Sequence, residues 1–177
     1  MQLWSIKMRK TLRAIILSIN AVTRFAEILS EIGLAFLMIM VFREVVWRYI
    51  FKTPSIFSVE LSEYLLVLIT FMSAAWVLHE DRHVNMTALI DYLPKKPRLY
   101  LDIITSILVM VFCSVLIWKG YKTVIMAYTG GYHSSSLVNF PLWISYSIIP
   151  LGTLILLSQY IIRIGNNIKM LIDLNRT

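Results

Sequence analysis

Cysteine is almost absent from this sequence, and charged residues are scarce. Cys113 is the only cysteine, which excludes an intrachain disulfide and any haem or zinc site built on several cysteines. Charged residues make up 15% of the chain and apolar residues 58%. Soluble domains carry about 25% charged residues and about half apolar ones. The mean hydropathy of +0.73 agrees with this excess. The composition excludes an ordinary soluble domain and indicates a membrane protein.

Four long apolar blocks account for the high hydropathy, and Pro54, Pro94 and the Gly130-Gly131 pair lie between them. Each block is long enough to cross a hydrocarbon core of about 30 Å as a helix. The predicted spans are approximately residues 28–50, 57–79, 99–119 and 141–162. The third helix is expected to continue as far as the Gly130-Gly131 pair. The sequence therefore predicts an all-α integral membrane protein with four transmembrane helices, forming a single membrane domain over residues 1–177.

Two further segments have one polar side and one apolar side, which is typical of helices that lie at a membrane surface. The first precedes the first span, and its polar positions recur at helical spacing: Lys10, Arg13, Asn20, Arg24, Glu27 and Glu31. The second lies between spans two and three and ends at Pro94. We predict an N-terminal amphipathic helix over residues 10–27 and a flat amphipathic helix over residues 84–93.

The basic residues indicate the orientation of the chain in the membrane. Twelve lysines and arginines lie in the N-terminal segment, the connection between spans two and three, and the C-terminal tail. On the opposite side of the membrane there are four: Arg48, Lys52, Lys119 and Lys122. Because cytoplasmic loops are enriched in lysine and arginine, both termini are predicted to be cytoplasmic. The net charge of +7 flanks apolar blocks. It therefore favours contact with membrane lipid, and no nucleic-acid partner is expected.

The segment from His79 to His83 matches the pattern H-E-x-x-H. On a helix this spacing places two imidazoles on one face for Zn²⁺, with Glu80 as a general base. A catalytic zinc needs a third protein ligand, and the candidates Asp91 and Asp102 have no supporting pattern around them. A membrane-embedded zinc hydrolase is therefore the alternative hypothesis, beside solvated polar residues at a membrane exit.

Charged residues also occur where spans one and two approach the predicted outer surface: Arg43, Glu44, Arg48, Glu60 and Glu63. Such residues inside a membrane normally face a partner or a water-filled cavity. One interpretation is a proton or ion relay. Another is an interhelical salt bridge from Arg43 to Glu60 or Glu63, with a Glu44–Arg48 pair one helical turn apart. A third is contact with another subunit.

Several short motifs follow one another in a characteristic order along the four spans. They are Arg48-Tyr49 with Phe51, Pro54, Glu60-Leu61, Ser73-Ala74-Ala75, His83-Val84, Gly120, Ser136-Leu137, and Pro141 with Trp143, Tyr146, Pro150 and Gly152. In this order the chain resembles the small membrane subunit (DctQ type) of tripartite ATP-independent periplasmic (TRAP) transporters, over roughly residues 25 to 165. Ser73 stands where that family would be expected to have glycine, and His83 is a family landmark.

The resemblance implies a small scaffold subunit in the inner membrane of a bacterium. Its partners would be a large membrane subunit, which imports an organic acid with sodium coupling, and a periplasmic binding protein that delivers the solute. No cofactor, catalytic residue or solute-binding residue is implied for this chain. An autonomous small transporter is the remaining alternative, since the sequence alone identifies no partner.

Overall fold

The computed structural model describes residues 2–52, 56–80, 95–134 and 139–174. These residues form four α-helices, and within them the only strand-like feature is one bridge between His133 and Pro141. The helices are α1 (Gln2–Phe51), α2 (Ile56–His79), α4 (Lys95–Thr129) and α5 (Leu142–Leu174). All four are long and apolar enough to cross a membrane. The predicted all-α membrane fold with four spanning helices is confirmed.

Helix α1 is one continuous helix of 50 residues. The separate amphipathic helix predicted over residues 10–27 is not confirmed, because α1 shows no break between that segment and the first span. The sequence explains the continuity, since residues 2–51 contain no proline and a single glycine, Gly33. The second amphipathic helix, predicted over residues 84–93, lies outside the described residues.

Helix α2 coincides with the second predicted span, whereas α4 and α5 extend well beyond theirs. Helix α4 ends at Thr129, next to the glycine pair that was expected to stop it. Gly131 has a φ of +58°, and the amide of Tyr132 donates to the carbonyl of Ala127 at 3.0 Å. A left-handed residue after the last turn is a common helix terminator, because it turns the chain back onto free carbonyls.

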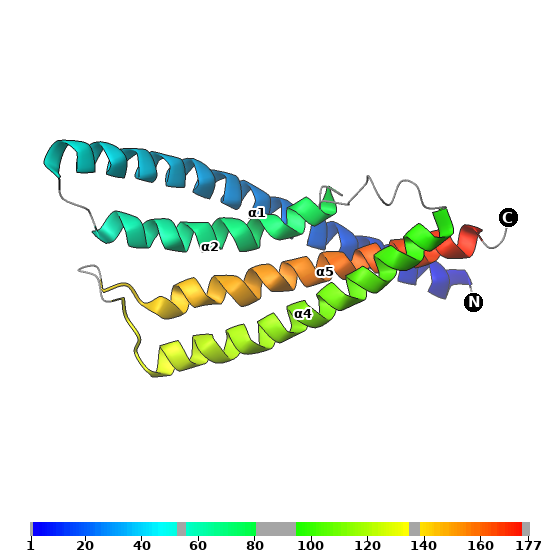
Figure 1. The fold of residues 1–177 in the computed structure, drawn as a ribbon. Helices are drawn as coiled ribbons and strands as arrows, with labels where there is room; N and C mark the ends of the chain where they lie inside the picture. Colours follow the sequence, from blue (N-terminus) through cyan, green and yellow to red (C-terminus); the bar gives the residue numbers. More distant parts are fainter. Residues whose placement is uncertain (1, 53–55, 81–94, 135–138, 175–177) are drawn as a thin grey trace.

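The helices pack in the order α1, α2, α5, α4, and the terminal half of α1 also contacts α5. Both termini lie at one end of the bundle, which we call the terminal end (Figure 1). The turn after α1 and the loop after α4 lie at the opposite end, called here the loop end. Helices α1 and α4 are thus the two edges of the row. Of the described helices, α1, α4 and α5 continue beyond the end of α2 toward the terminal end.

Small and hydroxyl-bearing side chains occupy most of the contacts between helices. On α1 the buried positions recur three, four or seven residues apart: Thr23, Ala26, Ser30, Gly33, Met40 and Glu44. On α4 the contact positions recur every seven residues: Ser106, Cys113, Gly120 and Ala127. This spacing is typical of nearly parallel helix pairs, and small side chains let the backbones approach closely within a membrane.

Helices α2 and α5 approach each other closely at Gly152. A Cβ atom placed on Gly152 would lie 2.6 Å from the carbonyl oxygen of Phe71 and 2.7 Å from its Cβ atom. Because those atoms belong to the backbone or are fixed to it, no rotamer change could make room. Only glycine fits at this position of the central helix pair.

Candidate functional site

Charged side chains gather near the loop end of α1 and α2. Their pairing differs from the interhelical salt bridge considered for Arg43 in the sequence analysis. Within the described residues, Arg43 forms no ion pair with Glu60 or Glu63. It donates a hydrogen bond to the hydroxyl of Ser58, which is 1% exposed. The contact still joins α1 to α2. The predicted salt bridge is wrong because the first turn of α2 brings Ser58, and not a glutamate, next to Arg43.

Within this cluster, contacts inside one helix engage Glu44, Arg48 and Glu60. Arg48 Nε donates to Glu44 Oε1 at 2.9 Å, so the predicted pair one turn apart is formed. Glu44 is buried, whereas the Arg48 side chain is 52% exposed. The hydroxyl of Tyr64 donates to Glu60 at 2.7 Å, and Glu63 is exposed. These contacts form no continuous line of ionisable groups toward the terminal end.

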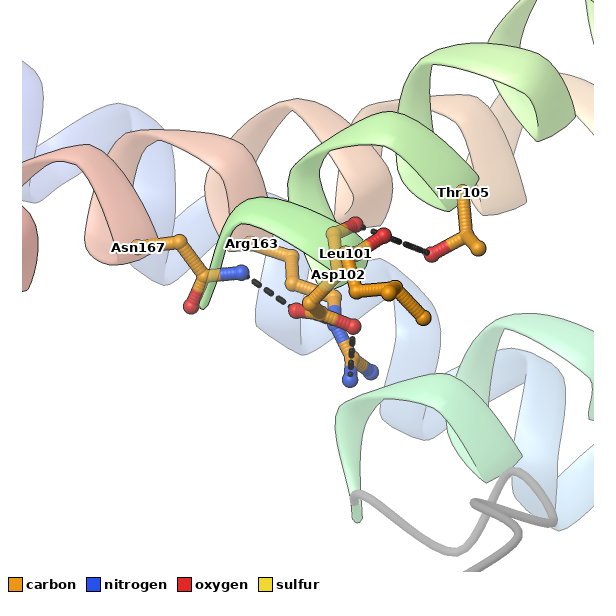
Figure 2. Close-up of polar contacts among 5 residues, drawn as sticks. All are labelled: Leu101, Asp102, Thr105, Arg163 and Asn167. Atoms are coloured by element: carbon orange, nitrogen blue, oxygen red, sulfur yellow. Dashed lines mark hydrogen bonds and ion pairs between the residues drawn. The ribbon is translucent and has the colours of Figure 1, made fainter. Parts of the chain in front are cut away.

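A stronger polar contact lies at the terminal end, where it joins α4 to α5 (Figure 2). Arg163 Nε and Nη2 each donate to a different oxygen of Asp102, both at 2.9 Å. Asn167, one turn further along α5, also donates to Asp102. The side chains of Arg163 and Asp102 are 17% and 26% exposed. Two parallel N–H···O bonds fix both the distance and the rotation of the two helices.

This bridge was missed at the level of the sequence, where Asp102 is only a candidate zinc ligand and Arg163 only a charge of the tail. The partners are 61 residues apart along the chain. A local signal does exist, because Arg163 and Asn167 are spaced one helical turn apart and therefore share a face. With Asp102 held by Arg163 and Asn167, its carboxylate is already engaged and is a poor candidate for a metal ligand.

A second polar network joins α5 to the terminal half of α1. The side-chain amide of Gln159 donates to Thr23 Oγ1 at 2.7 Å and to Asn20 Oδ1 at 3.2 Å. Gln159 is 4% exposed and Thr23 is fully buried. A buried amide needs such partners, because an unsatisfied polar group in an apolar interior is destabilising. Asn20, predicted to lie on the water-facing side of an amphipathic helix, instead contributes to helix packing.

The H-E-x-x-H segment begins at the last residue of α2. The imidazole of His79 stacks on the indole of Trp76, with ring centroids 5.2 Å apart, and Glu80 already lies in a turn. His83 and Asp91 lie outside the described residues. In the described ranges no three histidine, cysteine, aspartate or glutamate residues come together as a metal site. Helix α2 therefore ends at the first histidine of the segment.

A shallow groove of about 260 Å³ runs between α1 and α5. Its walls come from the two helices in equal measure: Ser18, Ile19 and Val22 of α1, and Leu154, Ile155 and Ser158 of α5. The two serine hydroxyls donate to backbone carbonyls of their own helices. The groove thus presents apolar surface with no charged group, which suits an acyl chain or an apolar side chain better than an organic acid.

Comparison with known proteins identifies the family. Residues 37–170 match the family described as tripartite ATP-independent periplasmic transporters, DctQ component. The chain is 28% identical to the sialic acid TRAP transporter small permease protein SiaQ of Vibrio cholerae, over 94% of this chain and 91% of that relative. It is 26% identical to the ectoine TRAP transporter small permease protein TeaB of Halomonas elongata, over 79% of this chain and 72% of that relative.

A third relative is a TRAP transporter small permease protein of Haemophilus influenzae, 32% identical over 54% of this chain. That match covers 60% of the relative. The family match spans more than half of the chain, from the middle of α1 to the terminal turns of α5. It therefore covers all four spanning helices and both interhelical polar contacts made by Arg43 and Arg163. The chain belongs to the DctQ component family, the small permease subunits of TRAP transporters.

Proposed function

We propose that this chain is the scaffold that holds the large membrane subunit of a TRAP transporter, and that it performs no chemistry itself. The observation that carries the proposal is the open row of helices. In the most apolar window of each span, only 22%, 11%, 11% and 22% of the residues are buried, in chain order. A row with two edge helices offers broad apolar faces to a second membrane protein, in addition to lipid.

The interhelical contacts support a rigid body. Gly152 fixes α2 against α5, Arg163 fixes α5 against α4, and Gln159 fixes α5 against α1. If the helices slid past one another, the backbones at Gly152 and Phe71 would clash. The polar groups of Arg163 and Gln159 would lose their hydrogen-bond partners. Such a body can serve as a fixed support against which a transporting domain moves.

The remaining elements of the proposal follow from family membership. The large subunit imports a solute that a periplasmic binding protein delivers, driven by a sodium gradient, in the inner membrane of a bacterium. Relatives are named for ectoine and for sialic acid, and both of these solutes carry a carboxylate. We therefore propose an organic acid as the solute class. From the distribution of lysine and arginine, we also propose that both termini of this chain are in the cytoplasm.

Uptake into proteoliposomes tests the proposal. The solute is the one that the cognate binding protein retains on purification, identified by mass spectrometry. We expect uptake only when this chain, the large subunit, the loaded binding protein and an inward sodium gradient are all present. Omission of this chain should reduce uptake to the background level of protein-free liposomes.

Two results would contradict the proposal. Full uptake by the large subunit without this chain would show that no scaffold is needed. Uptake by this chain alone would show an autonomous transporter. Proteoliposomes that contain this chain and the binding protein, without the large subunit, are the matched control for the second result.

A further inference from the structure

The contacts between α1 and α2 fix the depth of each α1 residue in the membrane. Helix α2 spans with 23 residues, Phe57–His79, and has Leu68 at its centre. At 1.5 Å per residue this length is about 35 Å, close to the thickness of one hydrocarbon core. A Cβ atom on Gly33 would lie 3.3 Å from Ile69 and 3.4 Å from Leu68. Gly33 therefore lies at the level of the membrane centre.

Two carboxylates of α1 lie close to that level. Glu31 is two residues from Gly33 and so about 3 Å from the centre along the helix. Glu27 is six residues away, at about 9 Å. Half of a hydrocarbon core is about 15 Å, so both positions fall inside it. Residues that the sequence places near the membrane surface thus lie deep in the membrane.

The side chain of Glu31 points away from the packing face of α1, whereas Glu27 is half-buried at the edge of that face. Glu27 and Glu31 each follow a buried residue, Ala26 and Ser30, and are turned by about 100° from it. Glu31 is exposed, and so are the neighbouring Ile28 and Ile32.

Arg24 lies one turn from Glu27 toward the terminal end and is also exposed. We call Arg24, Glu27 and Glu31 the α1 polar stripe. In the part of the chain that the structure describes, none of the three side chains makes a hydrogen bond or an ion pair, in contrast to Glu44, Asp102 and Arg163.

Ionisable residues within a membrane normally face a bundle interior, a water-filled cavity or a partner of opposite charge. The α1 polar stripe meets none of these conditions within this chain. Its composition, two carboxylates and one guanidinium, leaves an excess of negative charge at the deeper positions. A complementary surface must therefore offer a cation near the membrane centre.

We infer that the α1 polar stripe is the docking site for a helix of the large membrane subunit that carries a lysine or arginine at the depth of Glu31. The inference rests on the proposed function and specifies where the scaffold binds. The partner's cation pairs with Glu31, and its neighbouring apolar residues cover Ile28 and the adjoining surface of α1. Edge helix α1, and not α4, is then the helix nearest to the large subunit in this region.

The test compares lysine substitutions at two exposed positions of α1, Glu31 and Phe36, which lie within about 5 Å of the membrane centre and about 140° apart around the helix. Full-length chain is co-expressed with its large subunit, and the complex is purified through a tag on this chain. Glu31→Lys places a cation against the partner's cation and should lower the recovered large subunit by about tenfold or more. Phe36→Lys carries the same charge into the membrane on a different face of the helix. It should leave recovery within about twofold of the unmodified chain.

Glu31→Gln supplies a milder variant that is isosteric with the native residue. It keeps hydrogen-bonding groups but removes the charge, so recovery should fall by about threefold, between the other two results. Recovery of Glu31→Lys at the unmodified level would overturn the inference. Equal losses in Glu31→Lys and Phe36→Lys would overturn it as well, because the effect would then not depend on the face of α1.

A photo-crosslinking amino acid at position 31 separates the alternative neighbours of this surface. A crosslinked product with the large subunit is the expected result. A product with a second copy of this chain, or no protein product because the surface faces lipid, would overturn the inference. Both of these outcomes leave the proposed function intact so long as the unmodified chain still recovers the large subunit. Failure of the unmodified chain to recover it would contradict the proposed function itself.

Discussion

Substitution of Gly152 by valine is expected to separate α2 from α5 and to destabilise the bundle by about 2 kcal/mol or more. The added Cβ atom would lie 2.6 Å from the carbonyl oxygen of Phe71, a contact that requires a shift of one helix backbone. Because α2 and α5 are the two inner helices of the row, the shift affects both edges. Thermal unfolding of the purified chain in mild detergent, followed by tryptophan fluorescence, should show a midpoint lower by about 5 °C or more.

Gly165→Ala is the matched control on the same helix. A Cβ atom at Gly165 would meet nothing within 4 Å. Alanine is favoured over glycine within a helix by about 0.5–1 kcal/mol, so this variant should unfold at the same temperature or slightly higher. An unchanged midpoint for Gly152→Val would contradict the close packing of α2 against α5.

Loss of either partner in the Asp102–Arg163 pair is expected to weaken the attachment of α4 by about 2–3 kcal/mol. This is below the 3–5 kcal/mol typical of fully buried pairs, because the two side chains remain 17% and 26% exposed. Asp102→Ala and Arg163→Ala each leave an opposite charge without its main partner. The double variant removes both charges and should cost less than the sum of the single variants, by about 1 kcal/mol or more.

Lys119→Ala is the control for this cycle, because it removes an exposed charge from α4. Its removal should change the stability by about 0.5 kcal/mol or less. The same unfolding assay measures all four variants. Strictly additive losses for Asp102 and Arg163 would show that the pair does not couple α4 to α5.

The fold class could be predicted from the sequence because hydropathy and helix breakers act locally. The spans of α2 and the end of α4 at Gly130-Gly131 depend on length, composition and a glycine with positive φ. The start of the first span was harder to place. Polar residues appear as far as Glu31, but a change in polarity does not end a helix when no proline or paired glycine is present. Helix α1 accordingly continues through that boundary.

The contacts between helices could not be predicted in the same way. Spans that are apolar on all sides reveal the depth of a residue but not the direction in which it points. Arg43 was assigned the correct partner helix, yet its partner is Ser58, while Glu60 accepts a hydrogen bond from Tyr64 on its own helix. Asp102 and Arg163 meet only because α4 and α5 run side by side in opposite directions (Figure 1). Such pairing depends on rotation and register, which single spans do not encode.

We propose that this chain acts by holding a large membrane subunit. The decisive experiment is purification of a tagged chain from native membranes in mild detergent, with the bound proteins identified and their stoichiometry measured. We expect a large hydrophobic TRAP permease subunit to be recovered in near-equimolar amount. Recovery of the chain without any such subunit, in several detergents that leave its own helices folded, would contradict the scaffold function.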